Sequence, residues 1–305
     1  GVHDLSFQTA GGRARFKTSS SYIAIKAEMN YVSHMVNMCL IGSGCFDIYI
    51  NRNGLSTYYR SLKPATTEIT NGFEAIVGFE DIENKPEVLD ITIVFPLYNA
   101  LTELYIGLQE GSLLDFSDEY SYRKPVVYYG SSITQGGCAS RPGNSYEEML
   151  SRRFNLDYIN LGFSGNAKGE QAIADYIAEL DMLMFVMDYD HNAPDSDHLY
   201  RTHYNFYKTV REKNKDVPVI LMSRPNFDTN IENHLPRRTV VYNTFQLARN
   251  DGDRNIYFID GESLFGGFGR DSCTCDGCHP NDLGFYRMAE KIGSVMERIL
   301  IYQAE

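Results

Sequence analysis

The spacing of apolar and polar residues divides the chain into two parts with different periods. From residue 13 to about residue 110, short segments rich in β-branched and aromatic residues follow one another, as in ARFKTSSSYIAIKAEM and LDITIVFPLY. Such segments are typical of strands, and the dipeptide Asn53-Gly54 marks a hairpin turn. We therefore predict an all-β sandwich or jelly roll over residues 1–116. The polar segment 117–125, which ends in Pro125, is predicted to be a linker.

After Pro125, short apolar runs alternate with segments of helical period. The segment NSYEEMLSRRF opens with Ser145 and Glu148 at the spacing of a capping box. Alternating strands and helices predict a parallel sheet covered on both faces, so residues 126–305 are expected to form an α/β domain. The predicted strands lie at residues 126–129, 158–161, 182–187, 217–222 and 256–259. Two further segments each place apolar residues on one helical face: Ile173, Tyr176, Ile177 and Leu180, and Phe285, Met288, Ala289, Ile292, Met296 and Ile299.

Charge and composition narrow the possible partners. The net charge is −12, so phosphate backbones and anionic lipid surfaces should repel the protein, and neither nucleic acid nor a membrane is expected as a partner. No apolar run reaches the roughly 18–20 residues of a membrane span. No signal peptide is visible, but the chain begins at Gly1 without methionine, so a cytoplasmic and a secreted protein both stay open. The 22 tyrosines suit an ordinary β-sandwich better than a sugar-binding cleft.

Six cysteines are present, and three of them lie in the segment CTCDGCH at residues 273–279. That segment invites a zinc interpretation, yet a structural zinc site usually takes four ligands in two spaced pairs, and the sequence shows one cluster. We expect no metal and no other cofactor. A disulfide stays open, because the cysteine count does not prove an oxidising compartment. Cys138 has no strand-end position and is expected to be a packed thiol rather than a nucleophile.

The strand order also predicts where a ligand binds. In an open parallel sheet, ligands bind beyond the carboxyl ends of the strands. The loops after the first three predicted strands and the segment before the last helix should therefore meet at one edge of the sheet. These segments are residues 130–132, 162–166, 188–192 and 276–279.

Together these segments hold the parts of a nucleophilic serine site. Ser132 is the candidate nucleophile, His279 is the base that takes its proton, and Asp276 is the carboxylate that fixes the imidazole tautomer. Donors to the developing oxyanion are expected from the backbone N–H groups of Ser132 and Gly165 and from the side-chain amide of Asn192.

The segments GSSIT, NLGFSGNAKGE and DGCHPND resemble the blocks of the SGNH (GDSL-like) hydrolase family, in the same order, over residues 126 to about 300. The resemblance implies a flavodoxin-like three-layer α/β/α domain with a parallel sheet, which cleaves acyl esters without a metal. The nucleophile elbow of the α/β-hydrolases, Gly-x-Ser-x-Gly, fits less well, because position 134 is Thr.

Two positions depart from the family pattern. The acid that usually precedes the nucleophile is Ser131 here, and the third block, normally Gly-x-Asn-Asp, is replaced by MDYDHNAPD. We place the oxyanion amide at Asn192, because Asn-Ala-Pro suits a rigid loop. Asp188 either orients this loop through hydrogen bonds or is a solvated turn acid. Ser131, Asp188 and His191 are candidates for contact with substrate. The other histidines of the second half are expected in loops or at the surface: His198, His203 and His234.

The N-terminal part carries a second resemblance. The segment GCFDIY, residues 44–49, is similar to the Gly-x-Asp-Leu-Tyr signature of a jelly-roll family that precedes such hydrolase domains, with one extra residue after the glycine and Ile in place of Leu. Two-domain acylhydrolases of this kind include carbohydrate esterases. We therefore expect a serine esterase that removes small acyl groups, above all acetyl, from a carbohydrate or similar polar ester through an acyl-enzyme. The sandwich is expected to close one side of the cleft or to bind a glycan.

Three alternatives stay open. An acyltransferase would use the same residues with an alcohol in place of water. A lysophospholipase or thioesterase would act on other esters, although the net charge of −12 argues against a lipid surface. The altered third block is also compatible with a catalytically decayed carbohydrate-binding protein. The sequence leaves the acyl group, the alcohol, the oligomeric state and the compartment undetermined.

Overall fold

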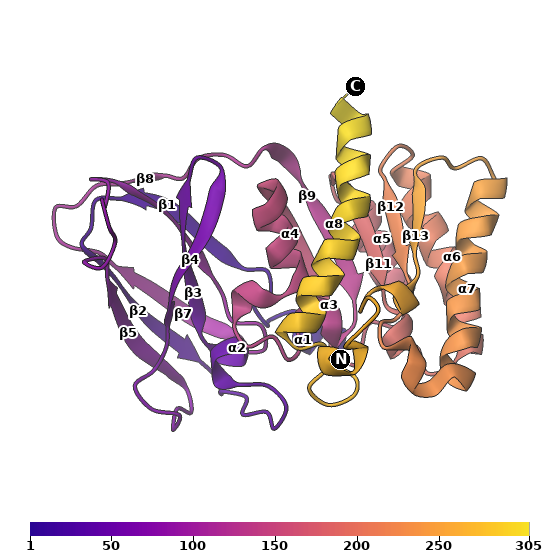
Figure 1. The fold of residues 1–305 in the computed structure, drawn as a ribbon, viewed down its shortest axis with the longest axis horizontal. Helices are drawn as coiled ribbons and strands as arrows, with labels where there is room; N and C mark the ends of the chain where they lie inside the picture. Colours follow the sequence, from indigo (N-terminus) through magenta and orange to yellow (C-terminus); the bar gives the residue numbers. More distant parts are fainter. Residues whose placement is uncertain (305) are drawn as a thin grey trace.

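The computed structural model describes residues 1–304 and confirms a β-sandwich followed by a three-layer α/β/α domain. The two units lie side by side, with the early part of the chain on the left and the later part on the right (Figure 1). Among the described residues, no helix is long and apolar enough to cross a membrane.

The sandwich consists of two antiparallel sheets, with strand orders β4-β3-β6-β1-β8 and β5-β2-β7. Side chains from both sheets, among them Phe16, Ile25 and Ile48, form one buried core. Asn53 and Gly54 both have a positive φ, as the tight turn of the predicted hairpin requires. The strands are β1 (Arg13–Thr18), β2 (Tyr22–Met29), β3 (Phe46–Arg52), β4 (Leu55–Leu62), β5 (Gly72–Gly78), β6 (Leu89–Val94), β7 (Leu101–Gly107) and β8 (Leu114–Phe116), with the short helix α2 (Leu40–Gly44) before β3.

The second unit contains a five-stranded sheet in the order β10-β9-β11-β12-β13, and all its pairs are parallel. Numbered within this unit, the order is 2-1-3-4-5, which is the flavodoxin-like arrangement. The first strand begins at Tyr122, inside the segment predicted as a linker. The strands are β9 (Tyr122–Gly130), β10 (Leu156–Gly162), β11 (Met184–Asp188), β12 (Val219–Met222) and β13 (Ile256–Ile259).

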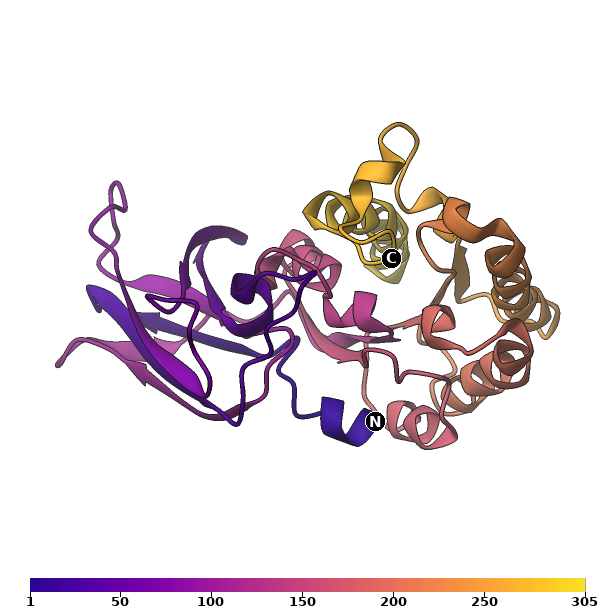
Figure 2. The same cartoon turned by 90° about the horizontal axis from the view of Figure 1, so that it is seen from below.

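Helices cover both faces of this sheet (Figure 2). Because side chains alternate along a strand, Val126 and Tyr128 of β9 pack on the face covered by α4 and α8. Val127 and Tyr129 pack on the opposite face, against α5, α6 and α7. Ser145 caps α4 as predicted, accepting a hydrogen bond from the backbone N–H of Glu148. The helices are α3 (Ser132–Gln135), α4 (Tyr146–Phe154), α5 (Gln171–Ala178), α6 (Ser196–Lys213), α7 (Ile231–Asn250) and α8 (Asp282–Ala304).

Three expectations about individual side chains are wrong. Tyr176 of α5 is 53% exposed, so it lies at the margin of the apolar face rather than within it. His203 and His234 are buried, although both were expected at the surface. A hydrogen bond between His203 Nδ1 and Thr244 Oγ1 at 2.9 Å compensates part of the cost of burying that imidazole.

The two units are joined by more than the linker. The first helix, α1 (Val2–Leu5), precedes the strands of the sandwich but packs on the second unit. Its side chains Val2 and Leu5 contact the core on the face covered by α5. Asp47 of β3 is fully buried and accepts hydrogen bonds from the Arg141 guanidinium and the Gly143 backbone N–H, both at 2.9 Å. Asp47 is the acid of the GCFDIY segment, so this motif ties the sandwich to the α/β unit.

Candidate active site

Ser132 lies at the point where the strand order reverses. The strand β9 pairs with β10 on one side and β11 on the other, and Ser132 is the first residue of α3, directly beyond its carboxyl end. A crevice is expected there in a parallel sheet. Gly130 is required before the turn, because a Cβ at this position would lie 2.0 Å from the Thr134 Oγ1 and 2.5 Å from the Asp188 carbonyl oxygen.

The hydroxyl of Ser132 meets the predicted base. Ser132 Oγ lies 2.9 Å from His279 Nε2, and His279 Nδ1 lies 2.8 Å from Asp276 Oδ2. These are the two contacts that a serine–histidine–aspartate triad needs, with Nδ1 donating to the carboxylate and Nε2 free to accept the serine proton. The structure thus brings together three residues that the sequence places at opposite ends of the α/β unit.

Asp276 is held as a carboxylate by several donors. Its Oδ1 accepts the backbone N–H groups of Cys278 at 3.0 Å and His279 at 2.7 Å. Its Oδ2 accepts the side-chain amide of Asn37 at 2.8 Å in addition to the imidazole. Partial burial works against ionisation, but these donors outweigh it and hold the pKa of Asp276 well below its usual range. The carboxylate therefore stays charged and orients the imidazole at all ordinary pH values.

The neighbours of His279 favour its protonated form. A hydrogen bond with the Cys278 side chain is the largest cause, and the Asp276 carboxylate adds to it, while burial opposes both. Together they raise the pKa of His279 to about 9. An imidazolium that is stabilised in this way is a good partner for the charged intermediate, but the base must first lose its proton to act.

The predicted oxyanion donors lie beyond the carboxyl ends of β9, β10 and β11. The backbone N–H of Ser132 is at the first position of a helix, where no carbonyl of the same helix can accept it. Gly165 has φ +69°, a conformation that glycine adopts readily, and a Cβ there would meet no heavy atom within 4 Å. Asn192 donates one amide hydrogen to the Phe163 carbonyl at 2.9 Å, which leaves the second hydrogen for a ligand.

The three further candidates for substrate contact lie at different depths. Ser131 is buried and its Oγ accepts the backbone N–H of Ile133 at 3.1 Å, so its hydroxyl caps α3. Asp188 is also buried, and burial raises its pKa well above the usual range while it accepts a hydrogen bond from Thr134 Oγ1. It is therefore not a solvated turn acid. His191 is half-buried, with Nε2 3.1 Å from Cys278 Sγ.

Asn37 and Tyr98 of the sandwich contact this site, and neither was predicted from the sequence. Asn37, in the loop between β2 and α2, donates to Asp276 as described above, and its carbonyl accepts the Cys275 thiol at 3.5 Å. Tyr98, after β6, donates its hydroxyl to the Ser132 carbonyl at 3.2 Å. Neither residue lies in a recognisable local pattern, because the contacts join segments that are distant in sequence.

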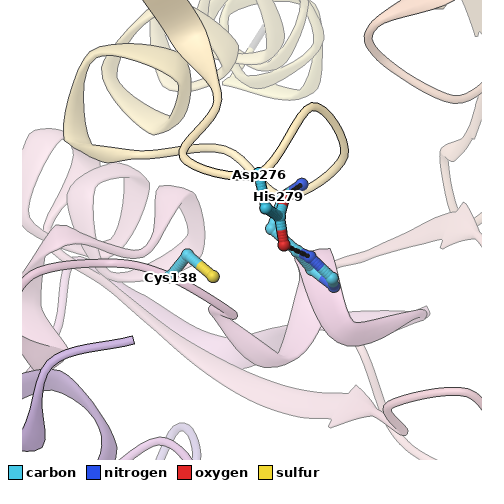
Figure 3. Close-up of side chains that lie close together, drawn as sticks. All are labelled: Cys138, Asp276 and His279. Atoms are coloured by element: carbon cyan, nitrogen blue, oxygen red, sulfur yellow. Dashed lines mark hydrogen bonds and ion pairs between the residues drawn. The ribbon is translucent and has the colours of Figure 1, made fainter. Parts of the chain in front are cut away.

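Cys138 is buried and lies beside the acid–base pair (Figure 3). One potential ligand atom from each of Cys138, Asp276 and His279 lies within 4.8 Å of the other two. A metal ion there would have to break the hydrogen bond between the carboxylate and the imidazole, so this donor set fits proton transfer better than metal coordination. The structure contains all six cysteines as free thiols.

One cavity lies away from Ser132 and His279. A polar cavity of about 130 Å³ between the two units is lined by residues such as Arg15, Asp90 and Arg152. Ser132 and His279 do not line it. We assign the chemistry to the sheet edge, because that location combines a nucleophile, a base and candidate oxyanion donors.

Comparison with protein families gives two matches. Residues 123–297 match the model described as the GDSL-like lipase/acylhydrolase family, and residues 1–114 match the one described as the N-terminus of SGNH hydrolase-type esterases. No curated protein matches the sequence.

Solved structures resemble the whole chain. A protein from Bacteroides ovatus described as a GDSL-like lipase is 29% identical with a TM-score of 0.88, over 98% of this chain and 87% of that one. The salicylyl-acyltransferase SsfX3 from a tetracycline biosynthetic pathway is 20% identical with a TM-score of 0.73, over 96% and 83%. A family two carbohydrate esterase from Clostridium thermocellum is 12% identical with a TM-score of 0.67, over 96% and 94%. The last two identities are low enough that they show a shared fold alone.

Proposed function

The chain belongs to the GDSL-like lipase/acylhydrolase family, whose members hydrolyse esters, and from this premise we propose a serine esterase that removes small acyl groups, in particular acetyl, from a carbohydrate or similar polar ester. The observation that carries the proposal is the 2.9 Å contact between Ser132 Oγ and His279 Nε2. In this proposal residues 126–305 form the catalytic domain. Residues 1–116 form a second domain whose Asn37 contacts Asp276.

The proposed reaction proceeds through an acyl-enzyme. Ser132 Oγ attacks the ester carbonyl as His279 Nε2 takes its proton, and the oxyanion binds the N–H groups of Ser132, Gly165 and Asn192. The imidazolium then protonates the leaving alcohol as the carbon–oxygen bond breaks. Water attacks the acyl-serine with His279 again acting as base, and the carboxylic acid and free Ser132 are released. Asp276 stays charged throughout and stabilises the imidazolium.

The nucleophile is tested with a fluorophosphonate probe. We expect one covalent label per chain in the wild-type protein and none in Ser132→Ala, together with a loss of ester hydrolysis of roughly 10⁴-fold or more. Labelling that persists in Ser132→Ala, or a wild-type protein that neither labels nor hydrolyses any ester, contradicts the proposal. The second result would favour the decayed carbohydrate-binding protein.

The substrate class is tested with an ester panel. The similarity to carbohydrate esterases supports acetylated sugars over long-chain and choline esters, and we expect the highest kcat/KM on the acetylated sugars. Adding alcohols as acceptors and analysing the products separates a hydrolase, which forms free acid, from an acyltransferase, which forms a new ester. A preference for long acyl chains would contradict the proposed substrate class.

A further inference from the structure

Arg224 lies against two loops of the active site. It follows β12 at the carboxyl edge of the sheet, and its Nη2 lies 3.3 Å from His191 Nε2. His191 Nε2 also lies 3.1 Å from Sγ of Cys278, the residue before the proposed base His279. The guanidinium therefore lies beside both the loop that carries the oxyanion residue Asn192 and the loop that carries the base.

Two buried donors in this group have no acceptor from the protein. Because His191 Nε2 accepts from Arg224, hydrogen-bond logic places the imidazole hydrogen on Nδ1. His191 Nδ1 and Arg224 Nε are both buried atoms that find no hydrogen-bond partner among the residues the structure describes. Leaving a buried donor without an acceptor is costly, so each of these two atoms calls for an acceptor from outside the chain.

The local charge is positive. Arg224 donates its backbone N–H to Asp190 Oδ2, but within the described part of the chain its guanidinium forms no ion pair with a carboxylate. Arg237 is buried beside them and donates to the backbone oxygens of Asp190 and Ala193. Burial raises the pKa of Asp190 to about 6 even though both arginines oppose the shift. Two guanidinium groups thus face one carboxylate, in a chain whose net charge is −12.

The remaining unsatisfied atom of the group is an acceptor, Asp190 Oδ1. It lies on the carboxylate that holds the Arg224 backbone, so it adds negative charge on the backbone side of the arginine. An incoming anion is therefore expected at the guanidinium, away from this carboxylate. Burial together with the positive charge of Arg224 lowers the pKa of His191 well below its usual range, so that imidazole is a neutral donor.

We infer that Arg224 forms an anion subsite that selects esters carrying a carboxylate close to the scissile bond. The inference rests on the proposed esterase function and narrows its substrate class. The carboxylate belongs either to the acyl part, as in a hemiester of a short dicarboxylic acid, or to the alcohol part, as in an ester of a uronic acid. Both present the same group to the guanidinium.

Matched substrates separate these two sources. For the acyl part, 4-nitrophenyl hemisuccinate is compared with 4-nitrophenyl butyrate, in which a methyl group replaces the carboxylate. For the alcohol part, acetylated galacturonic acid is compared with acetylated galactose. We expect the charged member of at least one pair to have the higher kcat/KM. In Arg224→Gln that value should fall about 10- to 100-fold, as expected for a hydrogen bond to a charged group, while the neutral ester changes less than about twofold.

The control is Arg254→Gln, which removes an exposed arginine. Arg254 precedes β13 and therefore lies at the amino edge of the sheet, whereas Arg224 lies at the carboxyl edge. This variant should leave both members of each pair unchanged. Equal losses on charged and neutral esters in Arg224→Gln, or a wild-type preference for the neutral member of both pairs, would overturn the subsite.

Binding provides a readout that does not depend on turnover. In Ser132→Ala, calorimetric titration with succinate and with galacturonate should detect binding of at least one of them, and a second change, Arg224→Gln, should weaken it about tenfold or more. Absent binding, or binding that Arg224→Gln leaves unchanged, shows that the unpaired donors bind only water. If this test fails while fluorophosphonate still labels the wild-type protein, only the anion subsite is contradicted. If the wild-type protein is not labelled, the proposed esterase function is contradicted.

Discussion

The nucleophile and the acid–base pair of this site are held in different ways. Ser132 begins a helix at the end of the central strand β9, is 5% exposed, and follows a serine that caps the same helix. Asp276 and His279 lie in an irregular segment before α8 and are held by hydrogen bonds to their own backbone and to Asn37 of the sandwich. One half of the chemistry thus depends on regular secondary structure, and the other depends on a neighbouring domain.

This difference tells us what the sandwich does. A separate glycan-binding module would leave the triad intact when removed, but Asn37 contacts the triad carboxylate itself. Removing residues 1–115 is therefore expected to damage turnover on small esters as well as on polymers. The predictions below probe first the nucleophile side, then the junction between the domains, and then the acid–base side.

The largest effect is expected on the nucleophile side, at the oxyanion amide. Asn192→Ala removes a donor that a preorganised site supplies without reorganisation, so kcat should fall about 10²- to 10³-fold. Steady-state kinetics on a small acetyl ester measures the loss, and Asn144→Ala, at an asparagine that bonds Ser140 Oγ instead, serves as the control. A fall of less than about threefold would mean that the oxyanion is bound without Asn192.

The next effect concerns the junction. Asp47→Ala leaves Arg141 without its buried carboxylate and should lower the free energy of unfolding by about 3 kcal/mol, the lower end of the range for broken buried pairs, because the Arg141 side chain is 23% exposed. Urea denaturation followed by circular dichroism measures it. Asp81→Ala, which removes an exposed partner of Arg60, should cost less than about 1 kcal/mol. Equal effects of the two changes would contradict a structural role for the buried pair.

On the acid–base side, Asn37→Ala removes the donor that the sandwich provides to Asp276. We expect kcat to fall about tenfold with KM unchanged, because Asn37 orients the carboxylate. Counting active sites with a fluorophosphonate burst separates two causes: a positioning role lowers turnover per labelled site, whereas a folding defect lowers the number of labelled sites. Val36→Ala, at an adjacent fully exposed residue, should change neither, and Asn37→Gln should restore part of the activity.

The smallest effect concerns pH. His279 acts as a base only when it is neutral, and its pKa is raised to about 9, so kcat/KM should increase with pH from neutral toward 9. Because the contact with Cys278 is the largest cause of the raised pKa, Cys278→Ala should move this limb to lower pH by about one unit or more. A pH profile of kcat/KM measures both, with Cys39→Ala as the control. A limb near pH 6.5 in both proteins would contradict the assignment.

Much of this site follows from local sequence, and the part that does not has a physical reason. Ser132 and His279 are each marked by a short segment at a strand or helix end, because glycine, serine and proline residues beside them end a strand or begin a helix. The strand Ile256–Ile259 is found where its apolar run predicts it. Asn37 carries no such mark, since its contact with Asp276 spans 239 positions and depends on how two domains pack. Arg224 is recognisable only once the partners of its N–H groups are known.

The docking of α1 has a consequence for synthesis on the ribosome. Val2 and Leu5 are made before the surface that receives them, which is built from strands and helices that follow the sandwich in the chain. Until the second domain has emerged, Val2 and Leu5 of α1 have no surface to pack on, so their apolar side chains stay exposed to water. Residues translated before the sandwich are thus among the last to reach their native place, and the docking of α1 is a late event in folding.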